Sequence, residues 1–215
     1  MEKLIEGVFK FQAQEYYPRR HFFQELSKGQ KPKALFITCS DSRINPHMLT
    51  QTEPGELFVL RNAGNIVPAH GTGSSGEQGS IEYAVSVLGI EHIVVCGHSH
   101  CGAMSGLMNP ASLSELPAVE KWLEHAEATR CVVNQKCSHL NDEERLLEAA
   151  KENVLVQLNN LRTIPSISMK LAEQKLKLHG WIYMIESGEV LTYEKNTNQF
   201  EPLLLEFPEL EASHS

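Results

Sequence analysis

The sequence lacks a long hydrophobic run, and it lacks an excess of positive charge. No window approaches the roughly 18 consecutive apolar residues of a membrane-spanning helix, and the start, MEKLIEGVFKF, has charges where a secretory signal peptide needs an apolar core. Asp and Glu number 27 against 19 Lys and Arg, so the formal charge is −8 and no basic field attracts phosphates. These absences predict a cytoplasmic protein with no membrane span and no nucleic-acid partner.

Cysteine is sparse, and its number is odd. The chain has five cysteines at irregular spacing: Cys39, Cys96, Cys101, Cys131 and Cys137. This pattern favours reduced thiols and metal binding over a disulfide framework. A disulfide between Cys131 and Cys137 stays open as the alternative.

Three short apolar runs show no alternation of apolar and polar residues. They are KALFIT, ELFVLRN and HIVVCG, at 33–38, 56–62 and 92–97. Such runs are typical of strands buried on both faces of a parallel sheet, and SIEYAVSVLG, between the last two, has helical periodicity. The strand, helix, strand order predicts an α/β fold with a central, mostly parallel β-sheet flanked by helices. Functional groups are then expected beyond the carboxyl ends of the strands.

Helical segments are predicted on both sides of these strands in the chain. Apolar residues recur at helical spacing over 1–17, and RRHFFQELSKG follows Pro18 and ends in a glycine. Residues 1–29 are therefore predicted to form an N-terminal helical arm that needs a surface to pack on. Residues 142–162 and 168–177 are predicted to form C-terminal helices.

The C-terminal part of the sequence predicts an edge hairpin. WIYMIESGEVLTYE is interpreted as two strands around a turn at Ser187-Gly188. The polar end over 208–215 is expected to fray. Because no internal repeat and no low-complexity linker is present, residues 1–215 are interpreted as a single domain.

The segment GHSHC contains a candidate metal site. His98 and Cys101 have two residues between them, so a turn that leaves a strand can direct both at one ion, and Cys39 at another strand end would supply a third ligand. Two thiolates and one imidazole leave the fourth position of a tetrahedral Zn²⁺ open, as in a catalytic site. His100 is a rival to His98, but its place next to Cys101 makes chelation of one ion harder. The alternative for Cys39 is a small buried apolar residue.

Asp41 and Arg43 follow Cys39 directly. A carboxylate next to a metal-bound water can accept a hydrogen bond from it, and an arginine fork can hold that carboxylate in place. The alternative is a pair that caps a turn, since Asp-Ser sequences after strands favour Asx turns.

Four motifs, in this order and spacing, resemble the β-class carbonic anhydrases: CSDSR, GELFVLRNAGN, SIEYAV and CGHSHCGA. The resemblance covers most of the chain and is nearest to the cyanobacterial carboxysomal members. It implies a zinc lyase that interconverts CO2 and bicarbonate on one Zn²⁺ per chain, held by Cys39, His98 and Cys101. It further implies that zinc-bound hydroxide attacks CO2 while Asp41 accepts its hydrogen bond and Arg43 keeps Asp41 ionised and aimed.

The resemblance also implies a substrate pocket. Gln30 matches a glutamine that reaches a neighbouring subunit's site in plant-like members, with an exposed helix-end residue as the alternative. Phe58, Ala63 and Tyr83 match an apolar slot for CO2, and Gly102 matches a backbone donor beside it. Core packing is the alternative for these four residues.

Family members dimerise by exchanging N-terminal helices, so the resemblance implies a homodimer or a higher oligomer built of dimers. It also implies a place in carbon concentration, inside carboxysomes, with shell or scaffold proteins as partners. The long C-terminal extension of carboxysomal relatives is missing here, which puts that delivery in doubt. A second departure concerns an allosteric bicarbonate site that some relatives form from a Trp, an Arg and a Tyr. Arg61 and Tyr183 match the Arg and the Tyr, but Phe36 stands at the position of the Trp and has no N–H donor. We therefore expect no such regulation.

Three rival functions stay open on the sequence. GTGSSG at 71–76 satisfies a dinucleotide-binding pattern, but it does not follow a strand directly and the next strand lacks the ribose-binding acid, so an oxidoreductase is disfavoured. A hydrolase of carbon disulfide or carbonyl sulfide would use the same scaffold and metal. A non-enzymatic carboxysome scaffold component with structural zinc is the third.

Overall fold

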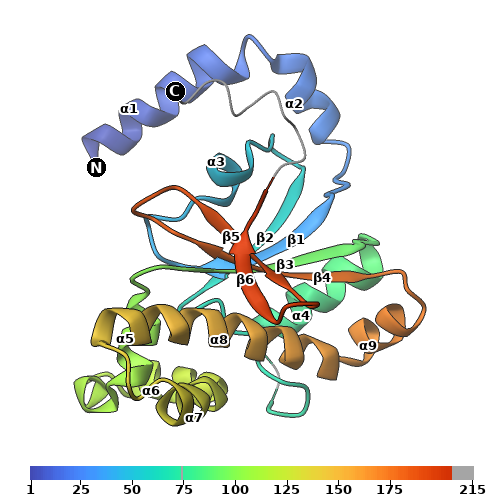
Figure 1. Ribbon diagram of the computed structural model, residues 1–215. Helices are drawn as coiled ribbons and strands as arrows, with labels where there is room; N and C mark the ends of the chain where they lie inside the picture. The colour runs from blue at the N-terminus through green and yellow to red at the C-terminus, as the bar shows by residue number, and fades with distance from the viewer. Residues whose placement is uncertain (74, 205–215) are drawn as a thin grey trace.

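The computed structural model describes residues 1–73 and 75–204, and a six-stranded sheet forms its centre (Figure 1). The order across the sheet is β2-β1-β3-β4-β5-β6. The strand bounds are β1 Ala34–Cys39, β2 Leu57–Asn62, β3 His92–His98, β4 Lys177–Tyr183, β5 Val190–Glu194 and β6 Gln199–Pro202. The first four strands are parallel, and β5 and β6 continue the sheet in antiparallel pairing. The predicted α/β class with a mostly parallel central sheet is confirmed.

The unalternating runs mark the strands at the middle of the sheet. In β1, Leu35, Phe36 and Ile37 are all almost fully buried, and Ile93 and Val95 in β3 are also buried. Burial of each such side chain stabilises the fold by about 1.5–3 kcal/mol, before the entropy of ordering the chain is subtracted. Both faces of these strands are covered, which is why they show no polar alternation.

The helices lie mainly on one side of the sheet (Figure 1). That layer contains α5 Gly102–Met108, α6 Pro117–Leu123, α7 Glu127–Lys136, α8 Asp142–Thr163 and α9 Pro165–Ala172, and α4 Gly76–Glu82 continues into a π-helical stretch, Tyr83–Val87. Short 3₁₀ turns at Pro110–Leu113 and Glu124–Ala126 flank α6, and α3 Pro46–Thr50 follows β1. A capping box between Asn141 and Glu144 begins α8. None of the described helices has the length and hydropathy of a membrane span.

The N-terminal arm lies on the opposite side of the sheet from α8 (Figure 1). It consists of α1 Glu2–Lys10, a π-helical stretch Phe11–Tyr16 and α2 Arg20–Leu26. The guanidinium of Arg19 pairs with the Glu53 carboxylate at 2.6 Å and ties the arm to the segment before β2. Apolar side chains of α1 are more than half exposed in the described chain: Leu4, Ile5, Val8 and Phe9. As the sequence predicts, the arm offers an apolar face that needs a partner surface.

The C-terminal predictions need correction in their boundaries. The helix expected over 168–177 is α9, which begins earlier, at Pro165, because proline suits the first helical position, and ends at Ala172. Gln174 then takes a left-handed conformation and Lys177 begins β4. The predicted hairpin is confirmed, because β4 and β5 pair in antiparallel fashion on either side of the Ser187-Gly188 turn. It lies one strand inside the edge, since β4 also pairs in parallel with β3, and β6, which the sequence did not predict, forms the edge. The end over 208–215 lies outside the described residues.

Gly180 lets α8 approach the sheet closely. A Cβ atom at this position of β4 would lie 2.9 Å from Val154 Cγ1 and 3.0 Å from Leu158 Cδ1, both on α8. Real Cβ atoms essentially never lie as close to a neighbour as the first of these distances, the second is also tight, and both methyl groups are held in a packed core.

We therefore predict that Gly180→Ala lowers the free energy of unfolding by about 1–3 kcal/mol, the usual cost of overpacking a core. Urea denaturation followed by circular dichroism measures it. Gly79→Ala is the matched control, because a Cβ at that helical position meets no atom within 4 Å. Equal stability of the Gly180→Ala variant and the unchanged protein would contradict this account of the packing.

Candidate metal centre

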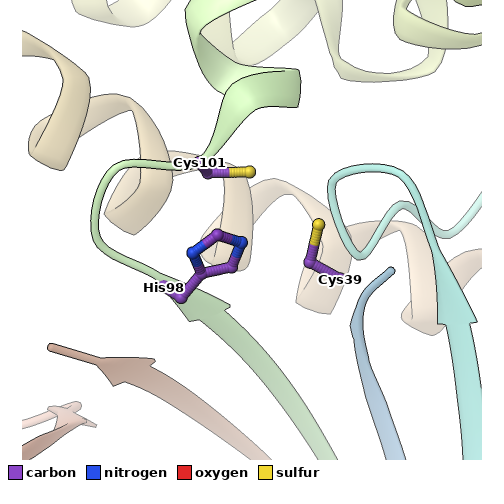
Figure 2. A group of neighbouring side chains, drawn as sticks. All are labelled: Cys39, His98 and Cys101. Atoms are coloured by element: carbon purple, nitrogen blue, oxygen red, sulfur yellow. The ribbon is translucent and has the colours of Figure 1, made fainter. Parts of the chain in front are cut away.

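Three side chains converge at the carboxyl ends of β1 and β3 (Figure 2). The Sγ atoms of Cys39 and Cys101 and a ring nitrogen of His98 all lie within 4.8 Å of one another. Cys39 and His98 are the last residues of their strands, and Cys101 immediately precedes α5. All three side chains are buried, so the arrangement is a closed donor set that could hold one metal ion.

The imidazole of His98 is oriented for metal binding. Its Nδ1 lies 2.8 Å from the Ser99 carbonyl, which only accepts, so Nδ1 carries the proton and Nε2 has a free lone pair. Nε2 is buried and has no hydrogen-bond partner among the described residues. A buried polar atom of this kind is costly unless something satisfies it, and a metal ion would do so. The donor set therefore fits a metal.

His100, the rival ligand, is not in this group. It takes a left-handed backbone conformation, and its Nε2 lies 3.7 Å from the Glu186 carboxylate. The structure thus brings His98, and not His100, to the two thiols.

The two thiols of the group interact with each other and with backbone amides. The hydrogen bond from Cys101, with smaller help from the Gly64 amide, lowers the pKa of Cys39 against the effect of burial. The same hydrogen bond and burial raise the pKa of Cys101. Each thiol therefore changes the pKa of the other, as expected for two titratable groups in contact.

Asp41 and Arg43 form a bidentate pair beside the ligands. Arg43 donates from Nε to Asp41 Oδ1 at 2.9 Å and from Nη2 to Oδ2 at 2.7 Å. The backbone amide of Arg43 also donates to Oδ1, so the turn predicted as the alternative is present together with the fork. Hydrogen bonds from Arg43 hold the pKa of Asp41 well below its ordinary value. The Oδ2 atom lies 3.8 Å from His98 Nε2, so an ionised carboxylate faces the donor set.

Arg61 has a structural role that the sequence reasoning missed. From β2 it donates to the carbonyl oxygens of Cys39 at 3.0 Å, Asp41 at 2.7 Å and Ile44 at 3.0 Å. Arg61 therefore fixes the backbone of the segment that carries Asp41 and Arg43. The available signal was a charged residue inside the apolar run ELFVLRN.

Phe36 is buried against Trp181, at a ring distance of 6.0 Å.

The residues predicted for the substrate pocket do not all lie near the metal centre. Phe58 and Tyr83 lie together, with ring centroids 6.2 Å apart, and Tyr83 is partly exposed. Gly102 is the first residue of α5, next to Cys101, and the Ala63 carbonyl accepts a hydrogen bond from an indole. Gln30 is exposed between α2 and β1. The described chain does not bring Gln30 into the three-ligand group.

The remaining cysteines stay separate from the centre. Cys131 and Cys137 are free thiols, so the alternative of a disulfide between them is wrong. Burial raises the pKa of Cys96 to about 12, which makes it an inert core residue. The GTGSSG pattern does not directly follow a strand, since β2 ends at Asn62, and its last residue, Gly76, begins α4.

Comparisons with known proteins agree on one family. The family model described as carbonic anhydrase matches residues 34–190. A carbonic anhydrase of Synechocystis sp. is 51% identical over 93% of this chain and 73% of its own length, and one of Pseudomonas aeruginosa is 49% identical over 99% and 96%. Among solved structures, the β-carbonic anhydrase CcaA is similar at a TM-score of 0.92, with 51% identity over 94% of this chain and 98% of its own. Tetrameric β-carbonic anhydrases from Sordaria macrospora match at a TM-score of 0.81, with 30% identity over 89% and 95%.

Proposed function

The chain belongs to the β-class carbonic anhydrases, and on this premise we propose that it reversibly hydrates CO2 to bicarbonate and a proton with one Zn²⁺ held by Cys39, His98 and Cys101. The observation that carries the proposal is the convergence of these three buried donors within 4.8 Å, with His98 Nε2 unpartnered. Zn²⁺ bound by two thiolates and an imidazole supplies a Lewis acid that makes water nucleophilic near neutral pH.

Asp41 accepts the hydrogen bond that orients the attacking water. Its carboxylate stays ionised through the working pH range, because the hydrogen bonds from Arg43 lower its pKa. Its position 3.8 Å from His98 Nε2 supports this role. Arg43 fixes the direction of the carboxylate and is itself anchored by a 3.0 Å hydrogen bond from Nη2 to the His100 carbonyl.

The pocket residues bind CO2 and exclude water. Phe58, Ala63 and Tyr83 supply the apolar surface for a molecule that has no charge, and the pairing of the Phe58 and Tyr83 rings supports this assignment. The backbone N–H of Gly102 donates to a substrate oxygen. Gln30 completes the pocket of a neighbouring subunit, which its exposed place after α2 supports.

Stopped-flow CO2 hydration at about pH 7 and about pH 8.5, with zinc quantified in the same sample, tests the proposed function. Turnover that is lost on chelation and restored by zinc supports it. One zinc per chain without turnover at either pH would contradict it. Parallel assays with carbon disulfide and carbonyl sulfide test the hydrolase alternative, and a folded protein that holds zinc but turns over none of these substrates would indicate a scaffold component.

We predict that Asp41→Asn keeps the metal and lowers kcat/KM on the order of 10²-fold, the usual range for loss of a positioned proton acceptor. The amide keeps the shape of the side chain but removes the negative charge. The rate and the metal content are measured together. Asp142→Asn, which alters an exposed carboxylate at the start of α8, is the control and should retain full activity. Normal hydration by the Asp41→Asn variant would show that Asp41 has no such role.

We further propose an oligomer built of dimers in which the N-terminal arms pack on the partner. The exposed apolar side chains of α1 and the tetrameric relatives from Sordaria macrospora support it. Phe9→Glu should reduce the sedimentation coefficient, because a charge cannot be buried in that interface without a partner. Gln12→Glu changes the charge equally at an exposed polar position and should leave the assembly intact. Identical sedimentation of both variants would contradict the arm exchange.

We propose a cytoplasmic location and, more specifically, the interior of carboxysomes, with shell or scaffold proteins as partners. The cyanobacterial relative, at 51% identity, supports this finer form. A fluorescent fusion expressed in a cyanobacterium should then concentrate in carboxysomes. Uniform cytoplasmic fluorescence would contradict the carboxysomal placement and leave the enzymatic proposal untouched.

A further inference from the structure

The loop after β2 reaches the metal centre through one peptide group. The backbone N–H of Gly64 donates to Cys39 Sγ at 3.3 Å, an ordinary distance for a hydrogen bond to sulfur. Figure 2 shows this loop, in teal, turning beside the Cys39 side chain. The N–H belongs to the peptide bond between Ala63 and Gly64, so its direction is set by whatever holds that peptide plane.

An indole holds the other side of the same peptide plane. Trp122 Nε1 donates to the Ala63 carbonyl at 2.8 Å from α6, a segment 59 residues further along the chain. Because a trans peptide points its C=O and N–H in opposite directions, a donor fixed at the oxygen aims the N–H at the sulfur. Hydrogen bonds in such a chain also polarise one another, which strengthens the bond to the sulfur. The Trp122 ring is itself positioned edge-on against His125, at a centroid distance of 5.6 Å.

The next carbonyl in the chain, that of Gly64, accepts a hydrogen bond from a second helix, α8. Asn153 on α8 is fully buried, and its Nδ2 donates to the Gly64 carbonyl at 2.8 Å. Gln157, one turn later, donates to Asn153 Oδ1 at 2.8 Å and accepts from the Val67 amide at 2.9 Å. Each polar side-chain atom of these two buried amides has a hydrogen-bond partner, so the pair holds the loop in one conformation.

Position 64 also requires a glycine. Its φ is +82°, and a Cβ there would lie 3.1 Å from Ala103 Cβ and 3.2 Å from Met104 Cε. The peptide therefore sits tightly between the start of α5 and the Cys39 sulfur.

We propose that Trp122 is a positioning residue for the metal centre: through the Ala63-Gly64 peptide it directs and strengthens the hydrogen bond to the Cys39 sulfur. This inference rests on the proposed metal site. A hydrogen bond to a coordinating thiolate withdraws electron density from the sulfur, and partners of this kind tune the ligand they contact. Trp122 thus limits how much charge Cys39 donates to a bound ion.

Cobalt substitution of Trp122→Phe tests the proposal. Phe keeps the aromatic bulk but has no N–H, and Co²⁺ in place of Zn²⁺ gives a thiolate-to-metal charge-transfer absorption band that reports the donor strength of sulfur. We expect the band to move to longer wavelength, and kcat/KM of the zinc form to fall about tenfold, the lower end of the usual range for such partners. Trp181→Phe is the matched control, since Trp181 is the second of two tryptophans in the chain and packs against Phe36 in the sheet. Its band should not move.

A second variant covers the case in which Trp122→Phe fails to fold. In the Trp181→Phe background, Trp122 can be replaced biosynthetically by benzothienylalanine, which has sulfur in place of the indole N–H and nearly the same shape. A red-shifted band in this protein supports the proposal. A band unchanged in every folded protein lacking the indole N–H overturns it while leaving the metal site intact, whereas an unmodified protein that shows no thiolate-to-cobalt band overturns the metal site as well.

Discussion

The parallel pairing of β1 with β3 is the interaction on which the metal centre depends. Their register places Thr38 opposite Cys96, so Cys39 and His98 emerge at the same edge of the sheet. The Thr38 hydroxyl also donates to the Cys96 carbonyl at 2.9 Å, across the two strands. A shift of this register would change which residues end the two strands side by side at this edge. The same burial that fixes the register also removes the ligands from water.

Hydrogen bonds from several strands and helices fix the polar groups around the metal centre. From β2, Arg61 fixes the segment of Asp41. From α6 and α8, Trp122 and Asn153 fix the two carbonyls of the Ala63-Gly64 unit. The Ser99 carbonyl fixes the tautomer of His98. Little of the centre is then free to reorganise, which is the condition under which oriented groups contribute most to catalysis.

Much of this could be predicted from the sequence where the signal was local. Unalternating runs such as KALFIT identified the inner strands, and the short spacing of His98 and Cys101 identified two donors on one turn. The contacts that could not be predicted join distant segments. Trp122 and Ala63 are 59 residues apart, and no local pattern indicates that they meet. The helices α5 to α7 were also not predicted, because they are short and are stabilised by packing under α8 more than by their own periodicity. Boundaries such as those of α9 depend on where the chain must turn back to the sheet.

We propose that this chain holds zinc through two thiolates and one imidazole and leaves the fourth position open. X-ray absorption at the zinc K-edge, on protein loaded with one equivalent of zinc, tests it most directly. We expect two sulfur neighbours at about 2.3 Å, one imidazole nitrogen at about 2.0–2.1 Å and one further oxygen ligand. A spectrum with no sulfur, or one with sulfur and nitrogen ligands from the protein at all four positions, would contradict it.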